Sequence, residues 1–172
     1  LILREQKSWT YGAYARLARQ RGVGHFEATA EVRTDVTDSA LVELLAQLKR
    51  MSAEAVPTDE LERVKNAMTG AFPTTIETAS QVAGQVASAT LYGLPSDYVA
   101  TYRQKLAAVT ANDVQAAAKV AIRPDAALIV VVGDGAKLYA KLKAIAPVSI
   151  VSAEGTSLTP DDLVVKAAAL DL

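Results

Sequence analysis

The sequence predicts an α+β fold, with helices packed on one face of a mixed or antiparallel β-sheet in two layers. Over residues 9–18 and 26–33, apolar residues recur at every second position, which is the period of a strand. From residue 37 onward they recur every three or four positions, which is the period of a helix. Strands and helices are therefore segregated along the chain rather than alternating, as in α+β proteins.

The first 33 residues are expected to form a helical stub followed by a hairpin. Residues 1–5 have the composition of a last helical turn, and no initiator Met precedes them. We therefore expect Leu1 to be internal to a longer precursor. In the first strand, Trp9 and Tyr11 lie on one face and Thr10 on the other, and a Gly-rich turn at 19–24 leads into the second, antiparallel strand.

Five consecutive helices are predicted between residues 37 and 122. Their limits are set by local signals: Thr37 or Asp38 as a first N-cap, Pro57 before an acidic first turn, and Ser96 as an N-cap after a Gly-Leu-Pro stop. A capping-box spacing marks the start of the last helix. The predicted helices cover residues 37–55, 58–72, 76–91, 96–109 and 110–122.

The C-terminal part is expected to return to the sheet. Residues 126–132 are β-branched and apolar on both faces, which predicts a central strand. A Gly-Asp-Gly turn then leads into a helix over 136–145, and a last short strand follows at 148–151. We take residues 1–151 as one half-domain and residues 152–172 as a C-terminal tail with room for one short helix.

Composition excludes several classes of protein and site. The 18 basic and 19 acidic residues among 172 leave a net charge of -1, which gives no electrostatic footprint for nucleic acid or a membrane surface. There is no Cys, so a thiolate nucleophile or a Cys-ligated metal is absent. The longest apolar run, residues 126–132, is too short for a membrane span. The N-terminus does not have the pattern of a signal peptide, because it is charged from the start and lacks an apolar core.

Most residues of catalytic type have a structural explanation. The single histidine, His25, lies beside the hairpin turn, and without a second His or any Cys a typical zinc site is not expected. The glycines around Asp134 lack the pattern of a dinucleotide or phosphate loop and read as a turn before a helix. Two carboxylate pairs are assigned to helix starts or the tail rather than to acid–base chemistry, namely Glu60 with Glu62 and Asp161 with Asp162.

Arg4 and Tyr11 are the remaining candidates, seven residues apart across the change from helix to strand. An arginine offers five fixed donors, and a tyrosine offers one donor that can follow a developing oxyanion, so together they could hold a peptide carbonyl. They cannot by themselves make a nucleophile. The structural alternative places Arg4 in a surface ion pair with Glu5 or Asp35, and Tyr11 with its ring in the core and its hydroxyl at the edge.

The stretch Leu3-Arg4-Glu5-Gln6-Lys7-Ser8-Trp9-Thr10-Tyr11-Gly12 resembles the C-terminal, non-zinc half of the pitrilysin/insulinase family of zinc metallopeptidases, the inverted-motif zincins. That half typically carries Leu-Arg-Glu, a few variable residues, an aromatic or aliphatic residue, a small residue and Tyr. The segments 57–61 and 110–114, and a buried strand ending at Gly133, follow in the same order. Ser8 and Trp9 stand where Gly and an aliphatic residue are commoner. The resemblance covers residues 1–151.

The resemblance implies a half-domain fold like that of mitochondrial processing peptidase, in a chain that is inactive alone. In this family one half carries His-x-x-Glu-His and the zinc, and the other offers an Arg–Tyr pair across the cleft. Carried onto this chain, Arg4 binds the substrate backbone and Tyr11 donates to the oxyanion, with no metal ligand in this chain and zinc in a partner half. The expected partners are that zinc-bearing half-domain or subunit and a peptide substrate.

Two other readings stay open: a structural or assembly subunit of the same fold with no peptidase role, and an unrelated α+β binding module. The resemblance also places the opening strands of the family upstream of Leu1, which leaves an uncovered sheet edge and predicts self-association. Both the periplasm and the cytoplasm stay open as the compartment, and the bacterial type of the sequence favours the periplasm.

Overall fold

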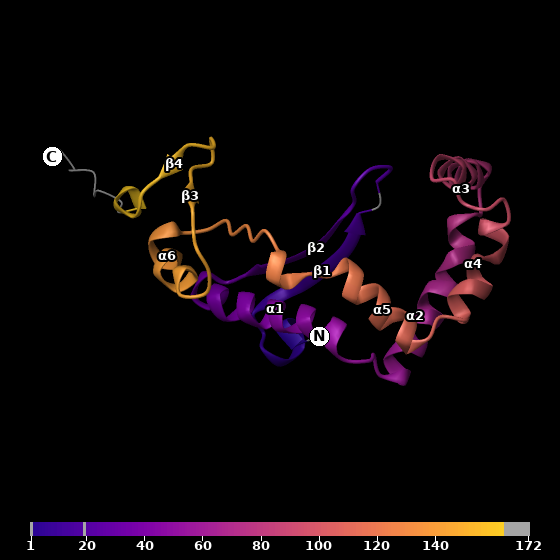
Figure 1. The fold of residues 1–172 in the computed structure, drawn as a ribbon, viewed down its shortest axis with the longest axis horizontal. Helices are drawn as coiled ribbons and strands as arrows, with labels where there is room; N and C mark the ends of the chain where they lie inside the picture. Colours follow the sequence, from indigo (N-terminus) through magenta and orange to yellow (C-terminus); the bar gives the residue numbers. More distant parts are fainter. Residues whose placement is uncertain (1, 19, 164–172) are drawn as a thin grey trace. The chain divides into compact units, whose positions relative to one another are not determined.

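The computed structural model describes residues 2–18 and 20–163, and it confirms the α+β class (Figure 1). Within these residues, no helix combines the length and the apolar character that crossing a membrane requires. Short helical turns lie at Ile2–Gln6, Thr34–Val36, Phe72–Thr75, Pro124–Ala126 and Pro160–Leu163. The strands are β1 (Thr10–Ala18), β2 (His25–Val32), β3 (Ile150–Val151) and β4 (Ser157–Leu158). The α-helices are α1 (Thr37–Ala53), α2 (Thr58–Ala71), α3 (Ala79–Leu91), α4 (Tyr98–Ala107), α5 (Ala111–Ala121) and α6 (Gly135–Lys143).

The two-stranded sheet of β1 and β2 is the predicted N-terminal hairpin. Its strands are antiparallel, because a connection of six residues is too short for a parallel crossover. Arg16 on β1 and Glu27 on β2 link the two strands through an ion pair of 2.7 Å. A second small sheet joins β3 and β4, with Ile150 opposite Leu158.

Helix starts follow local capping chemistry. The predicted capping box of α5 is confirmed: the Asp113 amide donates to the Thr110 hydroxyl at 3.2 Å, and the Thr110 amide donates to the Asp113 carboxylate at 2.9 Å. An equivalent box between Thr78 and Gln81 starts α3, three residues later than predicted. The prediction of Ser96 as an N-cap is wrong, since α4 begins one residue later, after Asp97.

The predicted central strand at 126–132 is wrong. Ala126 ends a helical turn, and the residues after it pair with no strand among the described residues. Leu128, Val130 and Val132 are 91%, 75% and 96% exposed. High β-propensity does not make a strand by itself, because the backbone N–H and C=O groups of a strand need a neighbouring strand as partner. The predicted last strand at 148–151 is found as the shorter β3, whose partner β4 lies in the predicted tail.

Contacts group the chain into two compact units, and the first takes its described residues from Leu1–Tyr14, Ala28–Gln47 and Ala126–Leu172. The buried side chains of this unit are Leu3, Ala40 and Leu138. Gly135, at the start of α6, lies against the last helical turn, since a Cβ there would come 2.7 Å from Leu163 Cδ2.

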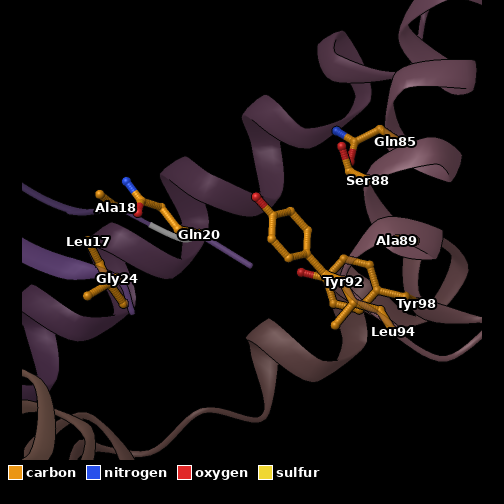
Figure 2. A pocket seen from close by; sticks show the side chains of 10 residues that line it. All are labelled: Leu17, Ala18, Gln20, Gly24, Gln85, Ser88, Ala89, Tyr92, Leu94 and Tyr98. Atoms are coloured by element: carbon orange, nitrogen blue, oxygen red, sulfur yellow. The ribbon is translucent and has the colours of Figure 1, made fainter. Parts of the chain in front are cut away.

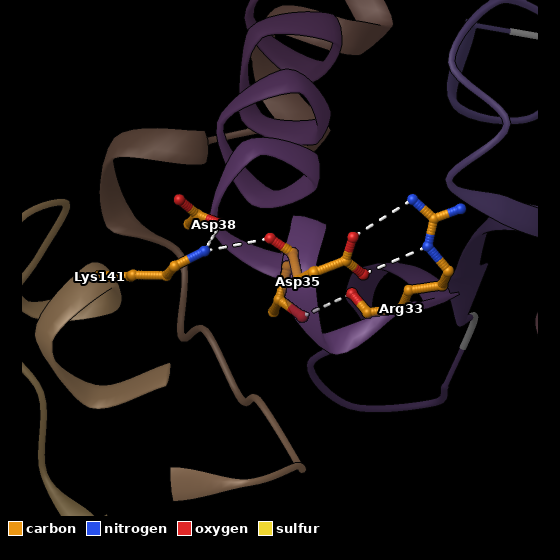
Figure 3. A network of polar contacts seen from close by, with 5 residues as sticks. Arg33, Asp35, Asp38 and Lys141 are labelled. Atoms are coloured by element: carbon orange, nitrogen blue, oxygen red, sulfur yellow. Dashed lines mark hydrogen bonds and ion pairs between the residues drawn. The ribbon is translucent and has the colours of Figure 1, made fainter. Parts of the chain in front are cut away.

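A polar network ties α6 to the start of α1 within the first unit (Figure 3). The Lys141 ammonium donates to the Asp35 carbonyl at 3.0 Å and to the Asp38 carboxylate at 3.2 Å. Arg33 in turn holds the Asp35 carboxylate through two donors at 3.2 and 3.3 Å. These cations hold the pKa of both carboxyl groups below their usual value, chiefly through the hydrogen bonds from Arg33 to Asp35 and from Lys141 to Asp38.

The second unit comprises Ala15–Glu27 and Leu48–Asp125. Here α2 contacts α4, and α4 contacts α3. The Phe72 and Tyr102 rings stack with centroids 4.6 Å apart, which is a favourable aromatic separation. The Gln115 side chain donates to the Ala53 carbonyl at 2.9 Å and so ties α5 to the end of α1. The buried hydrophobic side chains of this unit are Ala118 and Ile122.

Candidate functional site

The opening turn presents Arg4 to solvent because its neighbour Leu3 is buried. Leu3 is 5% exposed and anchors the turn in the core of the first unit. The Lys7 amide donates to the Ile2 carbonyl at 3.0 Å, which gives the turn its wide, π-helical form. The Ser8 amide donates to the Arg4 carbonyl at 3.1 Å, so the backbone of Arg4 is held while its side chain stays outside.

Ser8 redirects the chain from this turn into β1. Its φ of 53° lies in the left-handed region, which costs a residue with a Cβ more than it costs glycine. The Trp9 amide then donates to the Leu3 carbonyl at 2.9 Å and closes the end of the turn. The geometry accounts for the glycine that commonly occupies this position in the family that the sequence resembles.

The Arg4 guanidinium makes one weak, exposed ion pair. Its Nε lies 3.4 Å from the Glu5 carboxylate, and the two side chains are 65% and 57% exposed. Of the two partners that the structural alternative allowed, Glu5 is therefore the one used, because Asp35 is held by Arg33. An exposed ion pair of this kind contributes about 0–1 kcal/mol to the free energy of unfolding. An incoming carboxylate or carbonyl can therefore replace Glu5 as the partner of Arg4 at little cost.

The Tyr11 side chain projects into solvent and is 98% exposed. The alternative that places its ring in the core is therefore wrong. The alternation along β1 correctly separates two faces, but it does not say which of them is covered. Two hydrogen bonds brace the strand beside this ring, between the Thr10 hydroxyl and the backbone of Gly12. Arg4 and Tyr11 are thus both exposed donors, and no contact joins them directly.

The part of the chain that the structure describes offers no metal site beside this pair. Among residues 2–18 and 20–163, no group of three or more His, Asp or Glu side chains could hold a metal ion. His25 is exposed and lies 3.9 Å from Glu27, which already pairs with Arg16. Arg4 and Tyr11 thus present exposed donors, and the carboxylate that lies beside them is that of Glu5, which pairs with Arg4.

Three of the carboxylates that the sequence assigned to turns, helix starts or the tail have structural partners, namely Asp134, Asp162 and Glu62. Asp134 caps α6 by accepting from the Lys137 amide at 3.4 Å, and it pairs with the Lys137 ammonium at 2.7 Å. This contact lowers the pKa of Asp134 and raises that of Lys137. Asp162 accepts from both the amide and the hydroxyl of Thr159 at 2.7 Å, and Glu62 pairs with Lys65 at 2.9 Å. These groups are occupied by capping and pairing.

A cavity of about 550 Å³ lies within the second unit, and the sequence gives no signal for it (Figure 2). Residues near the hairpin turn line one side, and the end of α3 with the following turn lines the other, some 70 positions further along the chain. No acidic or basic side chain lines it, so it has the character of a binding cavity rather than of a centre for acid–base chemistry. Its lining residues are Leu17, Ala18, Gln20, Gly24, Gln85, Ser88, Ala89, Tyr92, Leu94 and Tyr98.

Comparison with known proteins bears on the segment that holds Arg4 and Tyr11. Residues 1–68 match a family model described as the peptidase M16 inactive domain. The chain is also similar to the crystal structure of a peptidase M16 inactive domain from Pseudomonas fluorescens, with 21% sequence identity and a TM-score of 0.66. That similarity covers 72% of this chain and 29% of the other, so this chain spans less than a third of that protein's length. No curated protein matches the sequence.

Proposed function

We propose that this chain is the substrate-holding half of a zinc metalloendopeptidase. The premise is that residues 1–68 match the model of the peptidase M16 inactive domain and that the chain has the fold of such a domain. Such a domain acts with a partner domain of the same family. In this proposal the partner half supplies zinc and the general base, and Arg4 and Tyr11 supply donors to the substrate. The chain alone hydrolyses no peptide.

The exposure of both donors beside one turn supports this proposal most directly. Arg4 makes an exposed ion pair with Glu5, and Tyr11 is 98% exposed. A large aromatic side chain that is left in water on a regular strand gains nothing for folding, which favours a role in contact with another molecule. Both residues lie in the first unit and in the matched segment.

The chemistry that we assign to the pair is binding and charge stabilisation. The Arg4 guanidinium donates to a backbone carbonyl of the substrate and holds it in the cleft. When bound in the partner half, zinc lowers the pKa of water and so supplies the nucleophile. The Tyr11 hydroxyl donates to the oxygen that becomes negative as the peptide carbonyl is attacked.

The test is Tyr11→Phe in this chain, assayed for peptide hydrolysis together with the zinc-bearing half. Removing one oxyanion donor is expected to lower kcat by about 10²–10³. Arg4→Ala is expected to raise KM more than it lowers kcat, because Arg4 binds ground state and transition state alike. Tyr139→Phe is the matched control, since it removes the same hydroxyl from a residue of α6, outside the strand that holds Tyr11. A Tyr11→Phe enzyme within about twofold of the parent would overturn the proposal.

The same experiment decides the competing reading, a structural or assembly subunit with no peptidase role. In that case the complete assembly would cleave no peptide even with the parent chain, while this chain would still bind and stabilise its partner. Loss of the assembly on removing this chain, without any change in proteolysis, would establish that reading.

We further propose that this chain associates with a second copy through residues 127–132. This segment holds Leu128, Val130 and Val132 in water, carries no charge that would repel an identical segment, and pairs with no strand among the described residues. An antiparallel pairing centred on Val130 would place Leu128 of each copy beside Val132 of the other.

Sedimentation of the parent chain over a range of concentrations tests this association. Val130→Lys should shift the equilibrium toward monomer, because each copy would place a positive charge at the centre of the pairing between the two segments. Val120→Lys is the matched control, since Val120 is 80% exposed but lies on α5. A parent chain that stays monomeric at all concentrations would refute the association.

A further inference from the structure

Thr10 makes an unusual double contact within its own strand. Its hydroxyl donates to the Gly12 carbonyl at 2.7 Å and accepts from the Gly12 amide at 3.0 Å. One hydroxyl therefore satisfies both backbone polar groups of the residue two positions ahead. The residue enclosed between the two ends of this contact is Tyr11.

Gly12 is the point at which the backbone next to Tyr11 is easiest to distort. Glycine has the widest range of backbone angles, so an unrestrained glycine would let the preceding peptide rotate. The Tyr11 ring cannot resist such rotation, since at 98% exposure it packs against almost nothing. The direction in which the Tyr11 side chain points is therefore set by its backbone alone.

A second contact holds Gly12 from the same face. A Cβ placed on Gly12 would come 2.8 Å from the Tyr14 hydroxyl and 3.0 Å from two atoms of its ring, so this ring lies directly over the glycine. Because side chains alternate along a strand, Thr10, Gly12 and Tyr14 share one face and Tyr11 takes the other. The restraint thus lies behind the Tyr11 side chain and leaves its hydroxyl unobstructed.

From this arrangement we infer that Thr10 is a positioning residue for Tyr11. Its hydroxyl fixes the peptide after Tyr11 and so aims the phenol, without touching the substrate. The catalytic consequence rests on the role proposed above for Tyr11. The local consequence, an ordered backbone at Tyr11 and Gly12, stands on the hydrogen bonds themselves.

The first test is on the chain alone, by NMR relaxation of the backbone amides. Thr10→Val keeps the shape of the side chain but removes the hydroxyl, whereas Thr10→Ser keeps the hydroxyl. We expect order parameters near about 0.85 at Tyr11 and Gly12 in the parent chain and in Thr10→Ser, and below about 0.6 in Thr10→Val. Thr29→Val is the matched control, being the same change at an exposed position of β2. Unchanged order in Thr10→Val would overturn the inference.

The second test is peptide hydrolysis in the assembly with the zinc-bearing half. Thr10→Val is expected to lower kcat about tenfold with KM within about twofold, and Thr10→Ser to restore the parent value. If Tyr11→Phe has no effect on turnover, the proposed function fails, while the NMR result still decides whether Thr10 orders this strand. If Tyr11→Phe is impaired and Thr10→Val is not, the positioning role is wrong and the proposed function stands.

Discussion

Among the described residues, Ser8 is the non-glycine residue that adopts a positive φ, which strains its backbone. It lies between the turn that holds Arg4 and the strand that holds Tyr11, so this strain affects the link between the two. Ser8→Gly should raise the free energy of unfolding by about 0.5–1 kcal/mol. The left-handed backbone costs a residue with a Cβ about 1–2 kcal/mol, and glycine avoids this cost. Part of this stabilisation is cancelled because glycine also has more conformational freedom in the unfolded chain. Urea denaturation followed by circular dichroism measures the change.

The control for this substitution is Ser88→Gly, in the middle of α3. There the backbone is helical and glycine is the poorer residue, so stability should fall by about 0.5 kcal/mol. If Ser8→Gly lowered the free energy of unfolding as Ser88→Gly does, the backbone of Ser8 would not be strained.

Residue spacing alone predicted much about the candidate site, but not its exposure. Local sequence provides the interval from Arg4 to Tyr11, leaves Glu5 or Asp35 open as the partner of Arg4, and assigns carboxylates to helix starts or the tail. The exposure of Tyr11 does not, because alternation identifies two faces of a strand without saying what covers either. The contact of Thr10 with Gly12 gave no signal either, since Thr is common in strands for reasons unrelated to such a bond.

At the scale of elements, the capping box of α5 gives a clear expectation. Thr110→Ala removes the hydroxyl that accepts from the Asp113 amide, and should lower the free energy of unfolding by about 1 kcal/mol. Thr58→Ala is the control, because Thr58 is the first residue of α2 and the cap position before it is Pro57, which offers no side-chain bond. Its effect in urea denaturation should stay within about 0.5 kcal/mol.

The contact between α6 and the start of α1 should make stability depend on pH. Lys141 holds the pKa of Asp38 below its unfolded value. The carboxylate therefore stabilises the fold at pH values above the unfolded pKa of about 4, and this contribution is lost as the pH falls through the lower, folded pKa. Asp38→Asn should lower Tm at pH 7, and the difference from the parent should vanish in acid.

The comparison for this pH effect is Asp97→Asn, which removes a carboxylate that makes no side-chain cap bond. Its Tm should follow the parent at every pH. If the effect of Asp38→Asn were the same at pH 7 and at pH 3, the ion pair with Lys141 would not be its cause.

Helices were predicted more closely than strands for a physical reason. Every hydrogen bond inside α1, α2 or α5 joins residues that are near in sequence, and their caps are local as well. A strand is completed only by a partner, and the apolar stretch 126–132 has the composition of a central strand without a neighbour among the described residues. The strand β4 escaped prediction because a strand of two residues carries almost no periodic signal, whereas β3 lies within the predicted strand 148–151.

At the scale of the whole molecule, the core is sparse for so apolar a chain. Among the described residues few hydrophobic side chains are buried, and many large apolar side chains remain exposed. Burial is the main favourable term in folding, so a chain with this distribution gains stability from whatever covers it. In the function proposed above, the partner half would supply that cover.

Zinc should not be part of what stabilises this chain. A metal site would add about 2.7 kcal/mol at a hundredfold excess over its Kd, which corresponds to a shift in Tm of several degrees for a chain of this size. Since no described cluster of His, Asp or Glu can hold a metal, Tm should be the same with added zinc and with a chelator. A rise in Tm with zinc alone would contradict the assignment of the metal to the partner half.

The exposed segment at residues 127–132 also affects how readily proteases cut the chain. Proteases bind their substrates as extended, unpaired backbone, and they cut most readily where such backbone is exposed. Leu128, Val130 and Val132 present this form in water, between the turn Pro124–Ala126 and α6. Until another strand covers this segment, we expect proteases to cut the chain there, and pairing with another chain should protect it.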